Sequence, residues 1–335
     1  MDPNAEGQDA PDSEALVKVD GLWFTTDTII VIRVENKIFR VSGGILAARS
    51  TVFNDMIAFP QPKSGETETM DGSPVVRLHD SPEDVEAFLR AIYDSSYFMP
   101  VPAPNEFSVV LGILRLTHKY GCQYLHRRAL EHLIANGWYG RTYYDDNSDH
   151  LSYGIIPKFS PAHDLRIIHA AIEVDAVWLL PYAYYFLSTY SSAELLPLLE
   201  GSMGSHVGKA LAAHTHLVRA TVSTHEFLTE GAYHACDTPE RCNPARSAAL
   251  ANLLRKLSDP ELTPIPSTAV QIIMDGLESL GACSVCCESP KKQVHEAASA
   301  FWDELPSIFG LPPWDTLHAM KRAAMGEEEE QDLED

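Results

Sequence analysis

The chain has 335 residues, a length that at roughly 150 residues per domain suggests about two domains. Its formal net charge is −22, so the molecule as a whole repels nucleic-acid phosphates and anionic lipid headgroups. The nearest basic cluster, Lys119 with Arg127 and Arg128, is interpreted as a solvated helix face beside Glu131. These features argue against direct nucleic-acid binding.

No segment resembles a targeting or membrane element. The stretch 1–14 is acidic and lacks an apolar core, which argues against a signal peptide. The richest apolar stretch, Ala176 to Leu187, contains Pro181 and is much shorter than the ~20 residues that a membrane span requires. We therefore expect a soluble protein of the cytoplasm or nucleus, without membrane contact.

Acidic tails flank the expected domains. Residues 1–16 are small, polar and acidic, and residues 327–335 are a block of like charges, so both are predicted to be disordered. Between the tails we predict an α+β domain over 17–136, a linker over 137–162, and an all-α domain over 163–326.

The first domain begins with a predicted hairpin. Residues 28–34 are almost continuously apolar and β-branched, which is typical of a strand covered on both faces. After a short polar turn, residues 38–42 are predicted to return as a second strand. Gly43-Gly44 is expected to end that strand, before one helical turn over 45–48.

Five further elements complete this domain. Ser50 is placed to cap a helix, and residues 75–78 form a third strand. Ser81-Pro82-Glu83-Asp84 then combines a capping box with Pro at the first helical position. Two more helices are predicted, the first opened by Asn105 and closed by Gly121, the second around Leu125 to Leu133 and ended by Gly137.

Over about Val17 to Asn136 the sequence resembles the BTB/POZ domain. The segments that carry the resemblance agree in order along the chain: FRV (39–41), ILAARS (45–50) with Phe53 and Met56, FLRAIY (88–93) and LTHKYGCQYL (116–125). The sequence also resembles the many BTB proteins of mushroom-forming fungi. The resemblance implies a fold with a short sheet and flanking helices, here followed by an all-α C-terminal domain.

The resemblance also implies a function. BTB/POZ domains are protein-interaction modules that form homodimers or heterodimers, and many dock a cullin scaffold to present substrates for ubiquitination. Others act in transcriptional repression complexes. Family members commonly have a histidine and a basic residue after the second strand, where this chain has Ser42 and Gly43. Asp27 could supply the acidic side of the charged pocket found in some members, but the basic partner is missing.

A loop after Asp94 contains Tyr97, Phe98 and Met99 in sequence. Aromatic and Met side chains on a loop are typical of interface anchors, so these three are candidate interaction residues. Burial of the same side chains inside the domain is the alternative interpretation.

The second domain is predicted to be helical throughout. The apolar spacing is helical from His163 onward, with Pro181 in a first turn or at a kink and a long helix over about 205–229. Further helices are predicted to begin at Asn243-Pro244 and Ser289-Pro290, and another to end at Gly281.

Five of the six cysteines lie in two groups of this domain. Cys236 and Cys242 precede one predicted helix, and Cys283, Cys286 and Cys287 precede another. Helix N-termini favour thiolates, and Cys236, Cys242, Cys283 and Cys286 could close a tetrahedral structural zinc site, with Cys287 or His234 as a substitute ligand. Two alternatives stay open: reduced cysteines packed as small apolar residues, and a redox or disulfide role.

Enzyme signatures are missing from the sequence. It contains no Gly-rich phosphate loop, G-x-S-x-G elbow or H-E-x-x-H helix. We therefore expect a non-enzymatic adaptor that dimerises or recruits a partner, with a cullin scaffold among the candidates and no cofactor besides one structural zinc. A transcriptional co-regulator without its own DNA-binding domain is a second hypothesis. A zinc- or thiol-dependent enzyme using the Cys236–Cys287 segment is a third.

Overall fold

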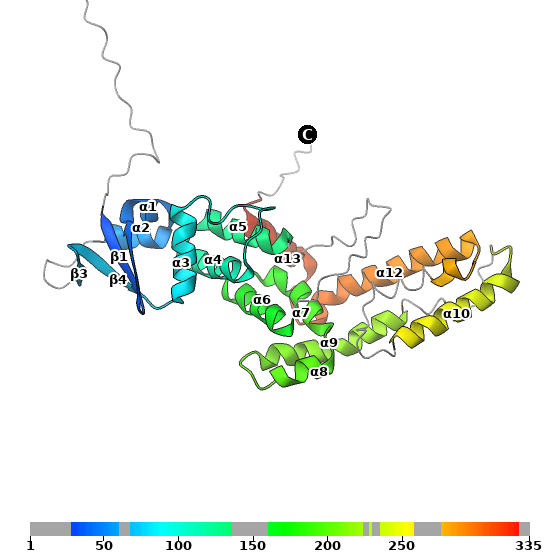
Figure 1. Cartoon of the computed structure of the whole chain (residues 1–335). Coiled ribbons are helices and arrows are strands. Elements are labelled where there is room, and N and C mark those ends of the chain that lie inside the picture. The colour runs from blue at the N-terminus through cyan, green and yellow to red at the C-terminus, as the bar shows by residue number, and fades with distance from the viewer. Residues whose placement is uncertain are drawn as a thin grey trace, which may run out of the picture. The chain divides into compact units, whose positions relative to one another are not determined.

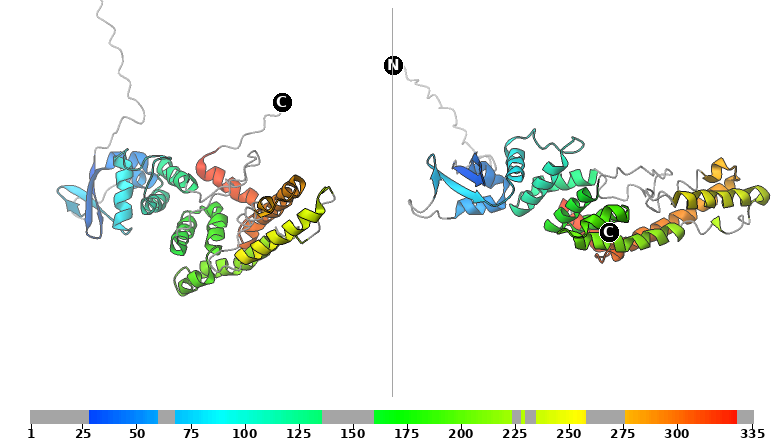
Figure 2. Two further views of the ribbon diagram at one scale, coloured as in Figure 1. Left: turned by 45° about the vertical axis from the view of Figure 1, so that its right-hand side comes forward. Right: turned by 60° about the horizontal axis from the view of Figure 1, so that its bottom comes forward.

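The computed structural model describes residues 28–59, 68–135, 160–223, 228–229, 235–257 and 276–327. Contacts divide the chain into two compact units. The first comprises Met1–Tyr97 with Tyr120–Gln123, and the second comprises Phe98–Lys119 with Tyr124–Asp335. Figure 1 gives the helices and strands of each unit, and Figure 2 gives two further views.

A mixed sheet is the centre of the first unit. Its strands are β1 (Ile29–Val34), β2 (Lys37–Ser42), β3 (Thr69–Met70) and β4 (Ser73–Leu78), in the order β2-β1-β4-β3. β1 is antiparallel to β2 and parallel to β4, while β3 is antiparallel to β4. The hairpin predicted over 28–42 is confirmed, and consecutive β1 residues from Ile30 to Ile32 are buried, as the continuous apolar run predicts.

Three helices of the first unit begin at serine caps. The hydroxyl oxygen of Ser42 accepts from Ile45 N before α1 (Gly43–Arg49), and that of Ser50 accepts from Phe53 N before α2 (Thr51–Ala58). Ser81 caps α3 (Pro82–Tyr93) by accepting from Asp84 N, with Pro82 in the first turn as predicted. β2 ends at Ser42, as Gly43-Gly44 predicted, but α1 begins at Gly43 and not at Ile45, because the Ser42 cap opens the helix there.

Aromatic packing fastens α2 to the turn at residues 120–123. The ring of Tyr120 lies 4.9 Å from that of Phe53 and 5.7 Å from that of Phe88, between ring centroids. The buried Ser50 hydroxyl donates to the Tyr120 carbonyl, and Thr51 N donates to the Gly121 carbonyl at 3.3 Å. Ser50 therefore joins helix capping to tertiary packing.

The described residues of the second unit form helices joined by turns, with no strand among them. Its α-helices are α4 (Phe107–Lys119), α5 (Gln123–Leu133), α6 (Pro161–Glu173), α7 (Leu180–Ser188), α8 (Ser192–Leu195), α9 (Gly204–Ser223), α10 (Pro239–Leu257), α12 (Ser284–Ile308) and α13 (Trp314–Met325). Short 3-10 turns, η2 (Val177–Leu179) and η3 (Leu196–Leu198), precede α7 and follow α8. No described helix is long and apolar enough to cross a membrane.

Large aromatic side chains form much of the described core of this unit. Trp302 on α12 packs against Tyr182 and Tyr185 of α7, with ring centroids 5.7 and 4.8 Å apart. The Trp314 indole N–H donates to the Trp302 carbonyl oxygen at 2.8 Å, which ties the start of α13 to α12. α7 begins one residue before Pro181, so the prediction of a first-turn proline is confirmed.

Two predicted helix starts are wrong. α10 begins at Pro239 and contains Pro244, and α12 begins at Ser284 and contains Pro290. A proline inside a helix removes one backbone hydrogen bond, and tertiary packing can offset that loss. The first-turn preference of proline therefore pointed to the wrong residue in both helices, and Cys242, Cys286 and Cys287 lie inside the helices, not before them.

Candidate metal centre and interaction surface

Both cysteine groups lie where a long helix begins. Cys236 precedes α10, and Cys242 lies in its first turns, where its N–H donates to Thr238 O at 3.0 Å. Cys283 is the N-cap of α12, and Cys286 and Cys287 are the third and fourth residues of that helix. The two N-termini therefore present their unpaired amides and positive potential to the same set of sulfurs.

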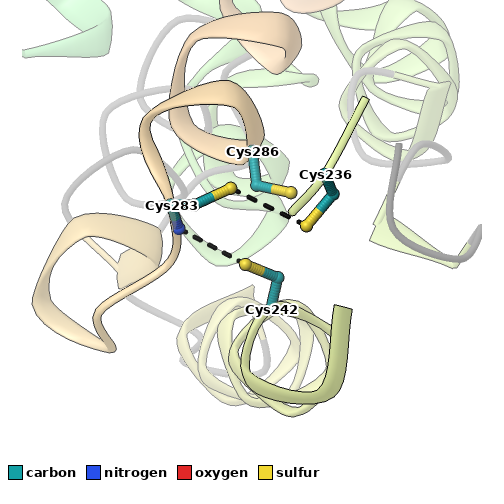
Figure 3. Close-up of side chains that lie close together, drawn as sticks. All are labelled: Cys236, Cys242, Cys283 and Cys286. Carbon is teal, nitrogen blue, oxygen red and sulfur yellow. Dashed lines mark hydrogen bonds between the residues drawn. The ribbon is translucent and has the colours of Figure 1, made fainter. Parts of the chain in front are cut away.

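The structure brings four of the candidate ligands together. The sulfur atoms of Cys236, Cys242, Cys283 and Cys286 all lie within 4.8 Å of one another. Figure 3 shows the four side chains turned toward one another, two from each helix start. The Cys236 and Cys283 sulfurs are 3.7 Å apart, and none of the six cysteines forms a disulfide. We call these four residues the cysteine cluster.

Hydrogen bonds to Cys242 favour its thiolate. Cys283 N donates to Cys242 Sγ at 3.3 Å, and the Thr238 hydroxyl lies 3.4 Å from the same sulfur. The Thr238 contact is the main reason that the pKa of Cys242 falls to about 6, while burial raises the pKa of Cys236. Thr238 was missed from the sequence, although a Thr directly before a helix-starting Pro signals a cap.

The substitute ligand Cys287 is not part of the cluster. The Cys287 thiol donates to Ala282 O at 3.8 Å, and burial followed by the charge of Glu278 raises its pKa. His234 lies outside the described residues. Cys287 is therefore a neighbouring thiol with a separate contact, which makes it useful as a control.

The predicted interaction residues Tyr97, Phe98 and Met99 have different environments. Phe98 is 1 % exposed, and its ring packs 5.0 Å from that of His132, so it is a core residue and unavailable as a surface anchor. Met99 is 45 % exposed, whereas Tyr97 is half-buried beneath the Arg90 guanidinium. An apolar loop signal does not reveal which of three consecutive side chains points inward, and here the middle one does.

A close backbone contact leaves no room for a side chain at residue 43, where BTB/POZ domains commonly have a basic residue. Gly43 N donates to Thr28 O at 2.7 Å, and a Cβ on Gly43 would also lie 2.7 Å from that oxygen. Ser42 is engaged as the cap of α1, and its carbonyl accepts from the Tyr93 hydroxyl at 2.6 Å. Asp27 lies outside the described residues. A larger side chain at residue 43 would therefore displace the first strand.

The first unit nevertheless exposes apolar side chains. β2 is an edge strand of the sheet, and its Ile38 is 56 % exposed. On the neighbouring helices, Ile45 and Val52 are exposed, and Phe59 at the C-cap of α2 is 69 % exposed. Edge strands and exposed apolar side chains are features through which protein modules pair with other chains.

The first unit thus combines a hairpin-based sheet, capped helices and exposed apolar side chains. Residues 22–137 match the BTB/POZ domain, so the chain contains a BTB/POZ domain followed by a helical C-terminal region. The BTB/POZ family consists of protein–protein interaction modules that mediate dimerisation. No curated protein matches the chain.

Proposed function

We propose that this chain is an adaptor whose BTB/POZ domain recruits a protein partner, either a second copy of itself or a cullin scaffold. The observation that carries this proposal is the BTB/POZ domain at residues 22–137, whose described residues include exposed apolar side chains on an edge strand and a helix pair. As a cullin-type ubiquitin ligase adaptor, the chain would bind the scaffold through this domain. Its helical region would then carry the substrate.

The lack of space at Gly43 favours binding through apolar side chains and the strand edge over binding through a charged pocket. A charged pocket needs a long basic side chain there, and the Thr28 carbonyl leaves no room for one. The edge of β2 and the exposed residues of α1 and α2 remain as contact features. Binding through them would depend on apolar burial and strand pairing, and therefore little on salt concentration.

The molar mass of the full chain in solution tests self-association. Size-exclusion chromatography with light scattering should give a dimer, and Phe59→Asp or Ile38→Asp should shift it toward the monomer by placing a charge on the contact surface. Ile172→Asp is the matched control, because Ile172 is an exposed apolar residue of α6 in the second unit. Equal weakening by the control would contradict a role for the BTB/POZ domain.

Cullin recruitment needs a separate measurement. Purified full chain would be mixed with purified cullin N-terminal regions, and complex formation would be followed by the same chromatography. A complex that Phe59→Asp or Ile38→Asp weakens would support the ubiquitin-ligase role. A chain that is monomeric and binds no cullin would overturn both forms of the proposal, and capture of chromatin-associated partners instead would favour the co-regulator hypothesis.

A further inference from the structure

We propose that Cys236, Cys242, Cys283 and Cys286 bind one zinc ion, which holds the beginnings of α10 and α12 together. This inference goes beyond the adaptor function and is independent of it, because all four residues follow the BTB/POZ domain at 22–137. It concerns how the helical region is held in shape.

The spacing of the sulfurs matches a tetrahedral ion. Four thiolates at ~2.3 Å from zinc stand at the corners of a tetrahedron whose edges are about 3.8 Å. The Cys236–Cys283 separation is 3.7 Å, and all four sulfurs lie within 4.8 Å of one another. Shifts of about 1 Å at most would complete the tetrahedron. A disulfide needs sulfurs at ~2.05 Å, so it would require a larger rearrangement.

The surroundings compensate the charge that such a site carries. Four thiolates around a divalent ion leave a net negative charge, which the N-termini of α10 and α12 stabilise. The Cys283 N–H and the Thr238 hydroxyl contact the Cys242 sulfur, as second-layer donors do around metal-bound thiolates. Arg246 follows Cys242 by one helical turn and is 2 % exposed, so a buried cation lies on the same side of α10.

The set of donors selects the metal and the role. Magnesium and calcium prefer oxygen ligands, whereas four thiolates favour zinc or iron. An iron–sulfur cluster places several irons and sulfides between its cysteines, so its thiolates would stand further apart than those seen here. Four protein ligands leave zinc no open position for water or substrate, so the ion would be structural and the enzyme hypothesis loses its reactive centre.

The packing next to the cluster explains why a metal would be useful there. α10 and α12 lie side by side in Figures 1 and 2. Beyond Cys242, the next buried apolar side chains of α10 are Ala245 and Ala249, which are small. Small side chains remove little apolar surface from water, so hydrophobic burial at this end is weak. A metal that joins residues 236–242 to residues 283–286 supplies the missing long-range constraint.

Metal analysis of the full chain tests the proposal. The protein would be produced in medium containing both zinc and iron, purified under reducing conditions without chelator, and analysed by mass spectrometry for metals. We expect about one zinc per chain. Replacement of zinc by cobalt(II) should give the visible bands of a tetrahedral ion and thiolate-to-cobalt charge-transfer bands. Cys286→Ser should lose the ion, whereas the adjacent Cys287→Ser should retain it.

Several outcomes would overturn the proposal. The proposal is wrong if the purified chain contains iron in place of zinc. It is also wrong if the wild-type chain is purified without metal and then binds no cobalt. Equal metal loss in Cys286→Ser and Cys287→Ser would overturn the ligand set. If Cys286→Ser does not fold, cobalt titration of the metal-stripped wild-type chain still shows whether the cysteine cluster binds a metal ion. Self-association and cullin binding through the BTB/POZ domain are separate readouts, so failure of either proposal leaves the other testable.

Discussion

The first unit and the α10–α12 pair bury different kinds of side chain at their contacts. In the first unit, Phe53, Phe88 and Tyr120 pack ring against ring. At the beginnings of α10 and α12, the side chains that meet are Cys242 and Cys286, and the next buried apolar residues of α10 are Ala245 and Ala249, with Leu253 one turn further on. Large rings stabilise through buried area alone, whereas thiols and alanines bury little and gain most from a bound metal.

Because of this difference, the two regions should respond differently to mutation and to removal of a metal ion. A packed aromatic core loses stability gradually as atoms are removed, because each deleted group costs its own burial and cavity energy. A metal-held contact is close to all-or-none, because removing the ion releases every ligand at once. The following experiments separate the two behaviours, beginning with the largest expected effect.

Removal of the metal should loosen only the α10–α12 pair. If the zinc proposal holds, a strong chelator under reducing conditions should abolish amide protection at the beginnings of both helices, since structural zinc contributes on the order of 10 kcal/mol in small zinc domains. Hydrogen exchange followed by mass spectrometry would locate the change. The β1–β2 hairpin is the internal control and should exchange as before. Unchanged protection at residues 239–245 and 284–290 would contradict a structural ion.

Phe53→Ala should strongly destabilise the first unit. Phe53 is 1 % exposed and packs against the Tyr120 ring, so truncation leaves a cavity and is expected to cost about 3–5 kcal/mol. Protection measured by hydrogen exchange in β1 and α2 should fall by the corresponding factor. Val52→Ala is the control, because Val52 is the preceding residue of α2 and is 44 % exposed. Similar losses in both variants would mean that burial does not determine stability here.

Gly121→Ala should have a smaller effect from a close backbone approach. Gly121 has a φ of +64°, and a Cβ there would lie 2.1 Å from Thr51 Oγ1, so the substitution combines strain with a clash and should cost about 2–3 kcal/mol. Gly72→Ala is the matched control, because Gly72 has a φ of +75° and nothing within 4 Å of the added Cβ. It should cost only about 1 kcal/mol.

Hydrogen exchange of the α2 amides measures this difference. The gap between the Gly121 and Gly72 variants isolates the contact with Thr51 from the conformational term, which the two glycines share. Equal losses would show that Thr51 simply rotates away.

The sequence predicted the first unit well because its signals are local. A continuous apolar run predicted β1, and the serines at 50 and 81 predicted the starts of α2 and α3. β3 was missed because Thr69-Met70 is only two residues long within a polar stretch, and pairing with β4 rather than propensity makes it a strand. Burial of Phe98 was likewise undecided, because it depends on the tertiary position of α5.

The cysteine cluster shows the opposite balance between local and long-range information. Its four residues were candidates because they are cysteines near predicted helix starts, but Cys236 and Cys283 are 47 residues apart, and no periodicity places them together. The helix starts were also misplaced, because Pro244 and Pro290 look like first-turn prolines and lie inside α10 and α12. Residue type identified the candidate ligands, whereas the true helix starts and the convergence of the two helices came only from the structure.

The last experiment concerns a buried carboxyl group in the second unit, far in sequence from the cysteines. Asp164 is 2 % exposed, and its Oδ2 has no hydrogen-bond partner. Burial raises its pKa to about 7, although a hydrogen bond with Tyr190 partly opposes the shift. The folded chain therefore keeps a proton that the unfolded chain releases above about pH 4, so the stability of this unit should fall as pH rises from about 4 to 7.

Asp164→Asn should remove this pH dependence, because an amide can accept from Tyr190 without carrying a charge. We expect the variant to be more stable than the wild type at pH 8, by on the order of a few kcal/mol, and similar to it near pH 4. Urea unfolding followed by tryptophan fluorescence measures this, since Trp178, Trp302 and Trp314 all lie in the second unit. Asp303→Asn, at an exposed residue of α12, should change stability little at either pH. A wild-type stability that rises between pH 4 and 7, with no gain from Asp164→Asn at pH 8, would contradict this account. It would show that the Asp164 carboxylate is solvated or paired in the folded chain.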